Sequence, residues 1–209
     1  MSVRIKRKME GAIKPFDQKL HDELDKKGRD AFCQYLNNIH IPNKKTIQNN
    51  IERGIDLLTL DSDDKVMCAW EIEVKREKSW NNQEVFPHER VHCLTRKDYQ
   101  WRKDQEFYDL IPYNVSPDCS VYYIILNYHC TKAVLLRPNL ILRYRPVYVQ
   151  NELGKNEFFR RIPVEKVLHL DLNIPDMFLF VSFGYIKIFI HILDDCIFDI
   201  WDCEIAIFI

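Results

Sequence analysis

Four ionisable residues lie inside stretches whose remaining residues are typical of apolar strands. Residues 54–77 read GIDLLTLDSDDKVMCAWEIEVKRE, two apolar runs separated by the charged turn DSDD. The first run carries Asp56, and the second carries Glu71, Glu73 and Lys75. Burying an unpaired charge is costly. The pattern therefore predicts either a solvated strand face or a site in which these charges compensate one another.

A divalent cation would reconcile these charges with a strand environment. Mg²⁺ prefers oxygen ligands, commonly one or two carboxylates together with waters and substrate phosphate oxygens. The carboxylates of Asp56 and Glu73 and the backbone carbonyl of Val74 could supply such oxygens. Alternate residues of a strand face the same side, so Lys75 points with Glu73. There it could orient or deprotonate an attacking water, or offset charge growing on a phosphate.

These residues resemble the PD-(D/E)xK signature of the restriction-endonuclease-like nucleases. In that superfamily an Asp ends one strand and the (D/E)xK tripeptide lies on the next, as Asp56 and Glu73-Val74-Lys75 do here. The resemblance covers residues 16–76 and extends towards 127. It implies an α/β fold with a mixed β-sheet flanked by helices. It also implies a Mg²⁺- or Mn²⁺-dependent endonuclease in which Asp56 and Glu73 bind the metal and Lys75 is catalytic.

Two details of the signature bear on this resemblance. Members often carry a further acid on the first helix, for which Glu23 is the candidate metal ligand. Ile55 stands where the signature has proline, and no Q-x-x-x-Y follows the lysine, which separates this chain from the RecB-like subfamily. Glu71 is expected beside the site or at the surface rather than as a ligand.

The surrounding elements follow from hydrophobic periodicity. Residues 16–38 repeat apolar positions at helical spacing and predict a helix. Residues 55–60 and 65–75 predict two strands of a hairpin. Residues 90–94 (RVHCL) predict a further strand, and residues 121–127 (VYYIILN) are β-branched and aromatic, as expected of a central strand.

A basic segment with interspersed aromatic residues follows, TRKDYQWRK at residues 95–103. Cations on phosphates and rings on bases are a common way to hold nucleic acid. The candidate nucleic-acid-binding residues are Arg96, Lys97, Arg102 and Lys103. The alternative is an amphipathic surface segment whose Tyr99 and Trp101 turn inward.

Two other function classes remain open. Residues 88–92 read HERVH and match the zinc-hydrolase pattern H-E-x-x-H, in which His88 and His92 would bind zinc and Glu89 would act as base. That chemistry requires the segment to be helical. The other alternative is a non-catalytic nucleic-acid-binding or assembly protein of the same fold.

Composition limits the remaining possibilities. Five glycines in 209 residues leave no Gly-rich phosphate loop, and seven cysteines without C-x-x-C indicate reduced thiols rather than a zinc or disulfide framework. The N-terminus lacks the apolar region of a secretory signal. We expect a cytoplasmic or other intracellular protein that binds nucleic acid, DNA in preference to RNA, with a homodimer allowed.

The last part of the chain differs in composition. Residues 1–176 are expected to form the nuclease-like domain, and residues 177–209 a hydrophobic C-terminal extension that carries one lysine and five acids. The apolar stretch 177–193 is at the short limit for a membrane helix and contains Lys187 and His191. Its richness in Ile and Phe favours strand, so no membrane span is expected.

Overall fold

The computed structural model describes residues 17–39, 43–51, 54–76, 78–83, 85–150 and 156–173. The predicted extension at 177–209 lies outside these ranges. In the described part of the chain, no helix combines the length and the apolar character needed to cross a bilayer.

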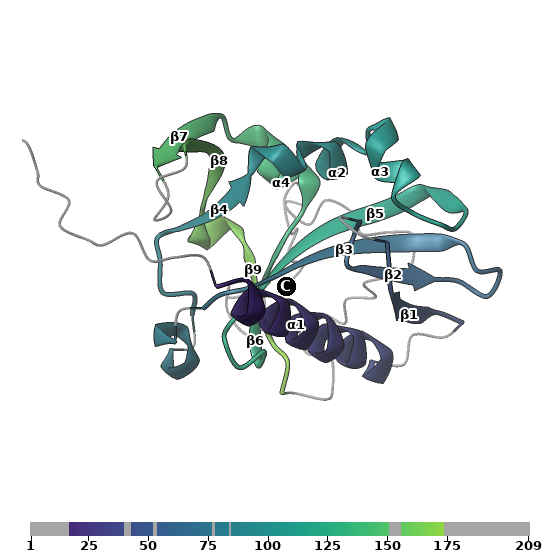
Figure 1. Ribbon diagram of the computed structural model, residues 1–209, viewed down its shortest axis with the longest axis horizontal. Helices are drawn as coiled ribbons and strands as arrows, with labels where there is room; N and C mark the ends of the chain where they lie inside the picture. Colours follow the sequence, from purple (N-terminus) through teal and green to yellow (C-terminus); the bar gives the residue numbers. More distant parts are fainter. Residues whose placement is uncertain are drawn as a thin grey trace, which may run out of the picture.

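A six-stranded mixed sheet forms the centre of the molecule (Figure 1). Its strands, in spatial order, are β1 (Lys45–Gln48), β2 (Leu57–Leu60), β3 (Val66–Val74), β5 (Val115–Leu126), β6 (Lys132–Leu136) and β9 (Leu168–Asp171). β3 and β5 run parallel, and every other neighbouring pair is antiparallel. The predicted central strand at 121–127 is confirmed, because β5 lies between β3 and β6.

A second, three-stranded sheet has the order β4 (Arg90–Leu94), β8 (Asn156–Pro163) and β7 (Pro146–Gln150). The predicted strand at 90–94 therefore exists but belongs to this small sheet. The helices are α1 (Gln18–Asn38), α2 (Asp98–Arg102), α3 (Gln105–Asp109) and α4 (Pro138–Arg143). Short 3₁₀ turns are η1 (Ser79–Asn82), η2 (Thr95–Lys97) and η3 (Val164–Lys166).

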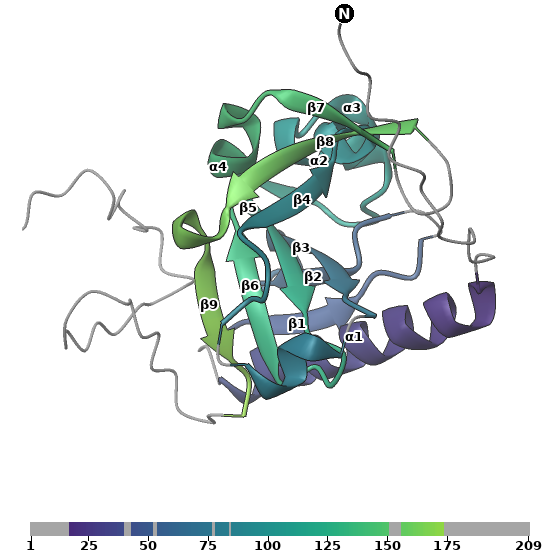
Figure 2. The same ribbon diagram turned by 90° about the vertical axis from the view of Figure 1, so that its left-hand side faces the viewer.

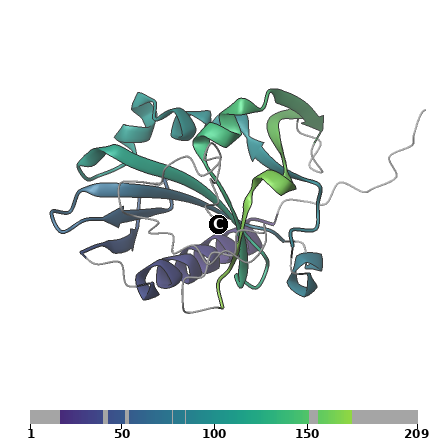
Figure 3. The ribbon, with the colours of Figure 1, turned by 180° about the vertical axis from the view of Figure 1, so that it is seen from behind.

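The two faces of the central sheet are covered differently. α1 lies along one face, while α2, α3, α4 and the small sheet lie on the other side (Figures 1 and 2). Strand alternation explains this, because Cys68, Trp70 and Ile72 pack in the cluster that contains α1. Ala69 and Tyr123 belong to the opposite cluster. Seen from behind, β9 forms the edge of the sheet beyond β6 (Figure 3). The mixed α/β architecture expected from the sequence is thus confirmed.

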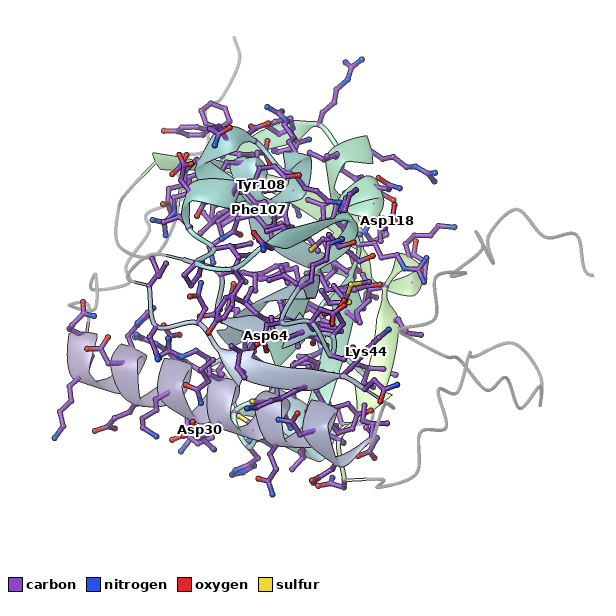
Figure 4. The ribbon with its side chains drawn as sticks, turned by 90° about the vertical axis from the view of Figure 1, so that its right-hand side faces the viewer. Asp30, Lys44, Asp64, Phe107, Tyr108 and Asp118 are labelled. Carbon is purple, nitrogen blue, oxygen red and sulfur yellow. The ribbon has the colours of Figure 1, made fainter. Side chains whose placement is uncertain are left out.

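α1 is defined by its cap and by a four-residue apolar repeat. Asp17 caps its N-terminus and accepts a hydrogen bond from the Leu20 backbone N–H at 3.0 Å. The buried stripe consists of Leu24, Gly28, Phe32 and Leu36. On the polar side, Asp30 accepts a hydrogen bond from Gln48 of β1 at 2.6 Å; Figure 4 shows Asp30 on α1 below the β2–β3 turn that carries Asp64.

Gly28 lets α1 approach β3 closely. A Cβ atom at this position would lie 2.5 Å from Cγ2 of Val74, a stiff β-branched side chain. We expect Gly28→Ala to lower the free energy of unfolding by about 1–3 kcal/mol through overpacking, although alanine has the higher helix propensity. Urea unfolding measures the change. Gln34→Ala, at an exposed position of the same helix, is the control; an equal change in both variants would contradict the packing argument.

The predicted hairpin is confirmed. β2 pairs antiparallel with β3, with Leu57 opposite Trp70 and Leu58 opposite Ala69. The turn is stabilised by Asp61, whose carboxylate accepts hydrogen bonds from the backbone of Asp63 and Lys65, each at 2.9 Å. Because this register is set by a tight turn and by buried pairs, it determines which residues stand beside the acids of β3.

Candidate active site

Asp56 is positioned by the end of the hairpin. It directly precedes β2, and the antiparallel register brings it alongside Glu71 of β3. Its Oδ2 atom accepts a hydrogen bond from the backbone N–H of Ile72 at 2.7 Å. This bond fixes the carboxylate of Asp56 against β3, and so holds it close to the acids of the second strand, as predicted.

Glu73 and Lys75 form a bonded pair at the end of β3. The Lys75 ammonium donates to Oε1 of Glu73, and the hydroxyl of Tyr123 on β5 donates to Oε2. Beyond the end of β3, the Lys75 backbone N–H continues the parallel ladder by donating to the Leu126 carbonyl at 2.9 Å. Both oxygens of Glu73 therefore have a donor, one from its own strand and one from the neighbouring strand.

Glu71 is buried and belongs to the site. Its side chain is 7% exposed. One oxygen accepts from the ammonium of Lys97 in η2, and the other accepts from Gln100 Nε2 of α2 at 2.9 Å. Glu71 is thus a neutralised internal acid rather than a surface group.

The charges of the three acids converge on Lys97. Burial alone would lower the pKa of Lys97, but the negative charges of Glu71, Glu73 and Asp56 raise it well above its ordinary value. The lysine is therefore a permanent cation among three carboxyl groups. The ammonium of Lys97, which was predicted to contact nucleic acid, is directed inward at Glu71 in this structure.

The two predicted metal ligands have opposite electrostatic surroundings. Burial would raise the pKa of Glu73, yet the charge and hydrogen bond of Lys75 and the hydrogen bond of Tyr123 lower it to about 2. For Asp56, burial and the nearby Glu71 charge raise the pKa to about 8, and the Ile72 N–H offsets this only in part. Without a bound cation, Asp56 therefore holds its proton near neutral pH, whereas Glu73 is ionised.

Asp56 makes the folded protein less stable as the pH rises. Its pKa is raised from 3.8 to about 8 in the folded state, so the folded chain keeps a proton that the unfolded chain releases. The free energy of unfolding should fall between pH ~4 and pH ~8 and level off above that range. Asp56→Asn should lack this component when urea midpoints at pH ~5 and ~8 are compared in EDTA. Identical pH dependence in both proteins would contradict the assignment.

Arg29 is a component of the site that the sequence did not indicate. It extends from α1, next to Gly28, and its Nη1 atom lies 3.8 Å from Oδ1 of Asp56. Its Nε atom is buried and makes no hydrogen bond in the described part of the chain. The only sequence signal was its position beside the buried stripe of the predicted helix.

Two further residues, Glu23 and Val74, were predicted to bind the metal ion. Glu23 does not lie with Asp56; its side chain is 62% exposed on α1 and pairs with Lys19 at 3.9 Å. Val74 turns its side chain towards α1. Only its backbone carbonyl could therefore bind a metal ion, as the sequence predicted. Within the described ranges, no three His, Cys, Asp or Glu side chains are grouped so that they could hold a metal ion. A Mg²⁺ site would thus use Asp56, Glu73 and non-side-chain oxygens.

The helical requirement of the zinc-hydrolase interpretation is not met. His92 lies in strand β4, which begins at Arg90, and residues 87–89 form a bend. An extended backbone does not bring residues four apart onto one helix face. The H-E-x-x-H pattern at His88–His92 therefore lacks the helical backbone that the zinc-hydrolase interpretation requires.

The basic segment 95–103 is only in part a surface feature. Arg96 is 72% exposed and lies 3.9 Å from Glu157, and Arg102 is 54% exposed beside Asp98 at 3.4 Å. Lys103 donates to the Cys119 carbonyl, while Trp101 is buried. Of the four residues predicted to contact nucleic acid, Arg96 and Arg102 thus lie at the surface. Trp101 turns inward, as the alternative of an amphipathic surface segment predicted.

Comparisons with known proteins identify no relative. The chain matches no protein-family model, no curated protein and no solved structure. The candidate site is accordingly defined by its own geometry: three acids on the paired ends of β2 and β3, with Lys75 and Lys97 bonded to two of them.

Proposed function

We propose that this chain is a Mg²⁺- or Mn²⁺-dependent nuclease with a restriction-endonuclease-like core that hydrolyses phosphodiester bonds in DNA. The observation that carries the proposal is the hydrogen bond that anchors Asp56 on the backbone of β3, beside Glu71. Asp56 and Glu73 both interact electrostatically with the same lysine, Lys97. The order α1, β2, β3 and then the parallel β5 agrees with the core that the signature implies.

The donor chemistry of the site fits a hard cation. Asp56 and Glu73 offer carboxylate oxygens, and Mg²⁺ commonly uses one or two carboxylates with waters and phosphate oxygens. Burial and the Glu71 charge raise the pKa of Asp56, and the positive charges of Lys97 and Arg29, whose Nη1 lies 3.8 Å away, offset this only in part. A bound cation would add the missing positive charge. When bound there, Mg²⁺ would polarise a phosphate oxygen and lower the pKa of a coordinated water.

The protein side chains divide the remaining tasks. Lys75 could orient the attacking water or offset charge on the phosphate, because its ammonium is only partly buried at the end of β3. Tyr123 holds one oxygen of Glu73, which sets the direction of that carboxylate. Lys97 neutralises Glu71 and keeps that acid from repelling a phosphate.

A cleavage assay tests the proposal. Plasmid and single-stranded DNA are incubated with Mg²⁺, Mn²⁺ or EDTA, and products are resolved by electrophoresis. Cleavage with either metal and none in EDTA is expected. A chain that leaves both substrates intact under all conditions would not be a nuclease.

One feature favours the non-catalytic alternative, a nucleic-acid-binding or assembly protein of the same fold. The acids already have internal cations, since Lys97 bonds Glu71 and Lys75 bonds Glu73. Such pairs could serve as a structural substitute for a metal ion. Nucleic-acid binding that is insensitive to EDTA, without cleavage in the same assay, would establish this alternative.

A further inference from the structure

The β7–β8 hairpin presents two aromatic rings to solvent. Tyr148 and Phe158 are directly opposed across the strands, their ring centroids are 5.7 Å apart, and they are 53% and 54% exposed. Several other large aromatic side chains in the described part of the chain are buried; Trp70 and Trp80, for example, are each 1% exposed. A paired, half-exposed aromatic surface is typical of a binding site.

The base of this hairpin is firmly held. Arg160 of β8 is buried and forms a two-pronged ion pair with Asp98 of α2, at 3.1 and 2.7 Å. It also donates to the Tyr144 carbonyl just before β7. The two rings are therefore displayed on a fixed support, in the small sheet that stands across the top of the molecule in Figure 2.

The charge around the rings favours a polyanion. Residues 143–150 and 156–161 contain four arginines and one acid, Glu157, and three arginines remain once the Arg160–Asp98 pair is set aside. Arg143 and Arg145 are exposed where the chain enters β7. Arginines that hold phosphates, combined with rings that stack on bases, are the usual surface for single-stranded nucleic acid. A protein partner would not need this excess of positive charge.

The small sheet also connects the rings to the candidate active site. His92 of β4 lies opposite Arg161 of β8, and its ring is 5.8 Å from that of Phe159. A bonded link comes from the neighbouring residues Lys97 and Asp98: Lys97 bonds Glu71 of the site, and Asp98 bonds Arg160 of β8. Phe158 is three residues from Arg161, about 10 Å along the strand.

Arg161 has capacity for a further hydrogen bond. Its Nε atom is buried and makes no hydrogen bond to any described residue. Arg161 lies on the opposite face of β8 from Phe158, because side chains alternate along a strand. The exposed arginines nearest the rings in sequence are Arg143 and Arg145.

We propose that Tyr148 and Phe158 of the β7–β8 hairpin stack an unpaired nucleobase, with the exposed Arg143 and Arg145 as contacts for nearby phosphates, so that the substrate is nucleic acid with a single-stranded segment. This inference rests on the proposed function for the identification of nucleic acid as the substrate. The stacking itself does not depend on hydrolysis.

Fluorescence anisotropy in EDTA tests the stacking. The probes are labelled oligo(dT), a reduced abasic deoxyribose-phosphate oligomer of the same length, and a blunt duplex of that length. Tyr148→Ser and Phe158→Ser should each weaken oligo(dT) binding about tenfold and leave abasic-oligomer binding within about twofold. The control Tyr113→Ser removes a 39% exposed ring from outside the hairpin and should bind like the wild type. Wild type should prefer oligo(dT) to the duplex.

Several results would overturn the proposal: unchanged oligo(dT) binding in both hairpin variants, equal losses on the abasic oligomer, the same loss in Tyr113→Ser, a preference for the duplex, or no binding by wild type. Urea unfolding should show all three variants folded, because each replaced ring is exposed. If the hairpin variants bind oligo(dT) more weakly but the wild type does not cleave DNA with any metal, the nuclease proposal fails and the stacking proposal stands. If the wild type cleaves DNA with a metal but the hairpin variants bind oligo(dT) like the wild type, the nuclease proposal stands and the stacking proposal fails.

Discussion

Lys75→Ala is expected to lower the rate of metal-dependent DNA cleavage by about 10²–10⁴-fold, the usual contribution of a positioned proton-transfer group. Lys75 is the only one of the two site lysines that is bonded to a proposed metal ligand, Glu73. Binding to nucleic acid in EDTA should change by no more than about twofold, because many phosphate contacts share the binding energy. Initial cleavage rates and anisotropy, measured on the same preparation, separate the two effects.

The matched control is Lys26→Ala. Lys26 also bonds a carboxylate, that of Asp30 at 2.6 Å, but it lies on the exposed side of α1. Its variant should cleave like the wild type. Lys75→Arg keeps the positive charge, and partial recovery in that variant would indicate charge stabilisation rather than proton transfer. Wild-type cleavage by Lys75→Ala would show that this lysine has no part in the reaction.

Lys97→Met is expected to reduce stability strongly. It removes the cation that is bonded to Glu71 and leaves a buried carboxylate with Gln100 as its remaining partner. Breaking a buried ion pair in this way costs about 3–5 kcal/mol. Urea unfolding at neutral pH should therefore show a clearly lower midpoint. DNA cleavage should fall with it, because β3 carries Glu71 and Glu73 and anchors Asp56.

Two further variants separate charge from packing. Glu71→Gln/Lys97→Met removes both charges and should regain most of the lost stability, since the uncompensated acid is gone. Arg96→Met removes a neighbouring cation from an exposed pair with Glu157 at 3.9 Å and should change the unfolding free energy by about 0–1 kcal/mol. If the double variant were as unstable as Lys97→Met, packing of the lysine stem would be its main contribution.

The local elements around the site were predictable from periodicity. The apolar repeat of α1, the β2–β3 hairpin and the strand at 121–127 all follow from the spacing of apolar residues and from a turn that Asp61 stabilises. Alternation along β3 likewise indicates that Glu71, Glu73 and Lys75 share one side. These features depend on residues close together in sequence, where steric rules leave few conformations.

The partners of the acids were not predictable in the same way. Arg29, Lys97 and Tyr123 reach the site from α1, η2 and β5, at sequence separations that no local pattern encodes. The segment at 95–103 illustrates the problem, because a basic and aromatic composition is equally compatible with a solvent-facing and an inward-facing lysine. Only the docking of η2 and α2 against β3 decides between them.

The sequence by itself therefore determined that an aspartate, two glutamates and a lysine occupy paired strand ends, because the pleat and the turn impose a side and a register. The tertiary structure decided the electrostatic state of each group. It buries Asp56 beside Glu71 and raises its pKa, and it surrounds Glu73 with donors that lower its pKa. Burial and charge proximity are properties of packed elements, and they arise only when distant segments meet.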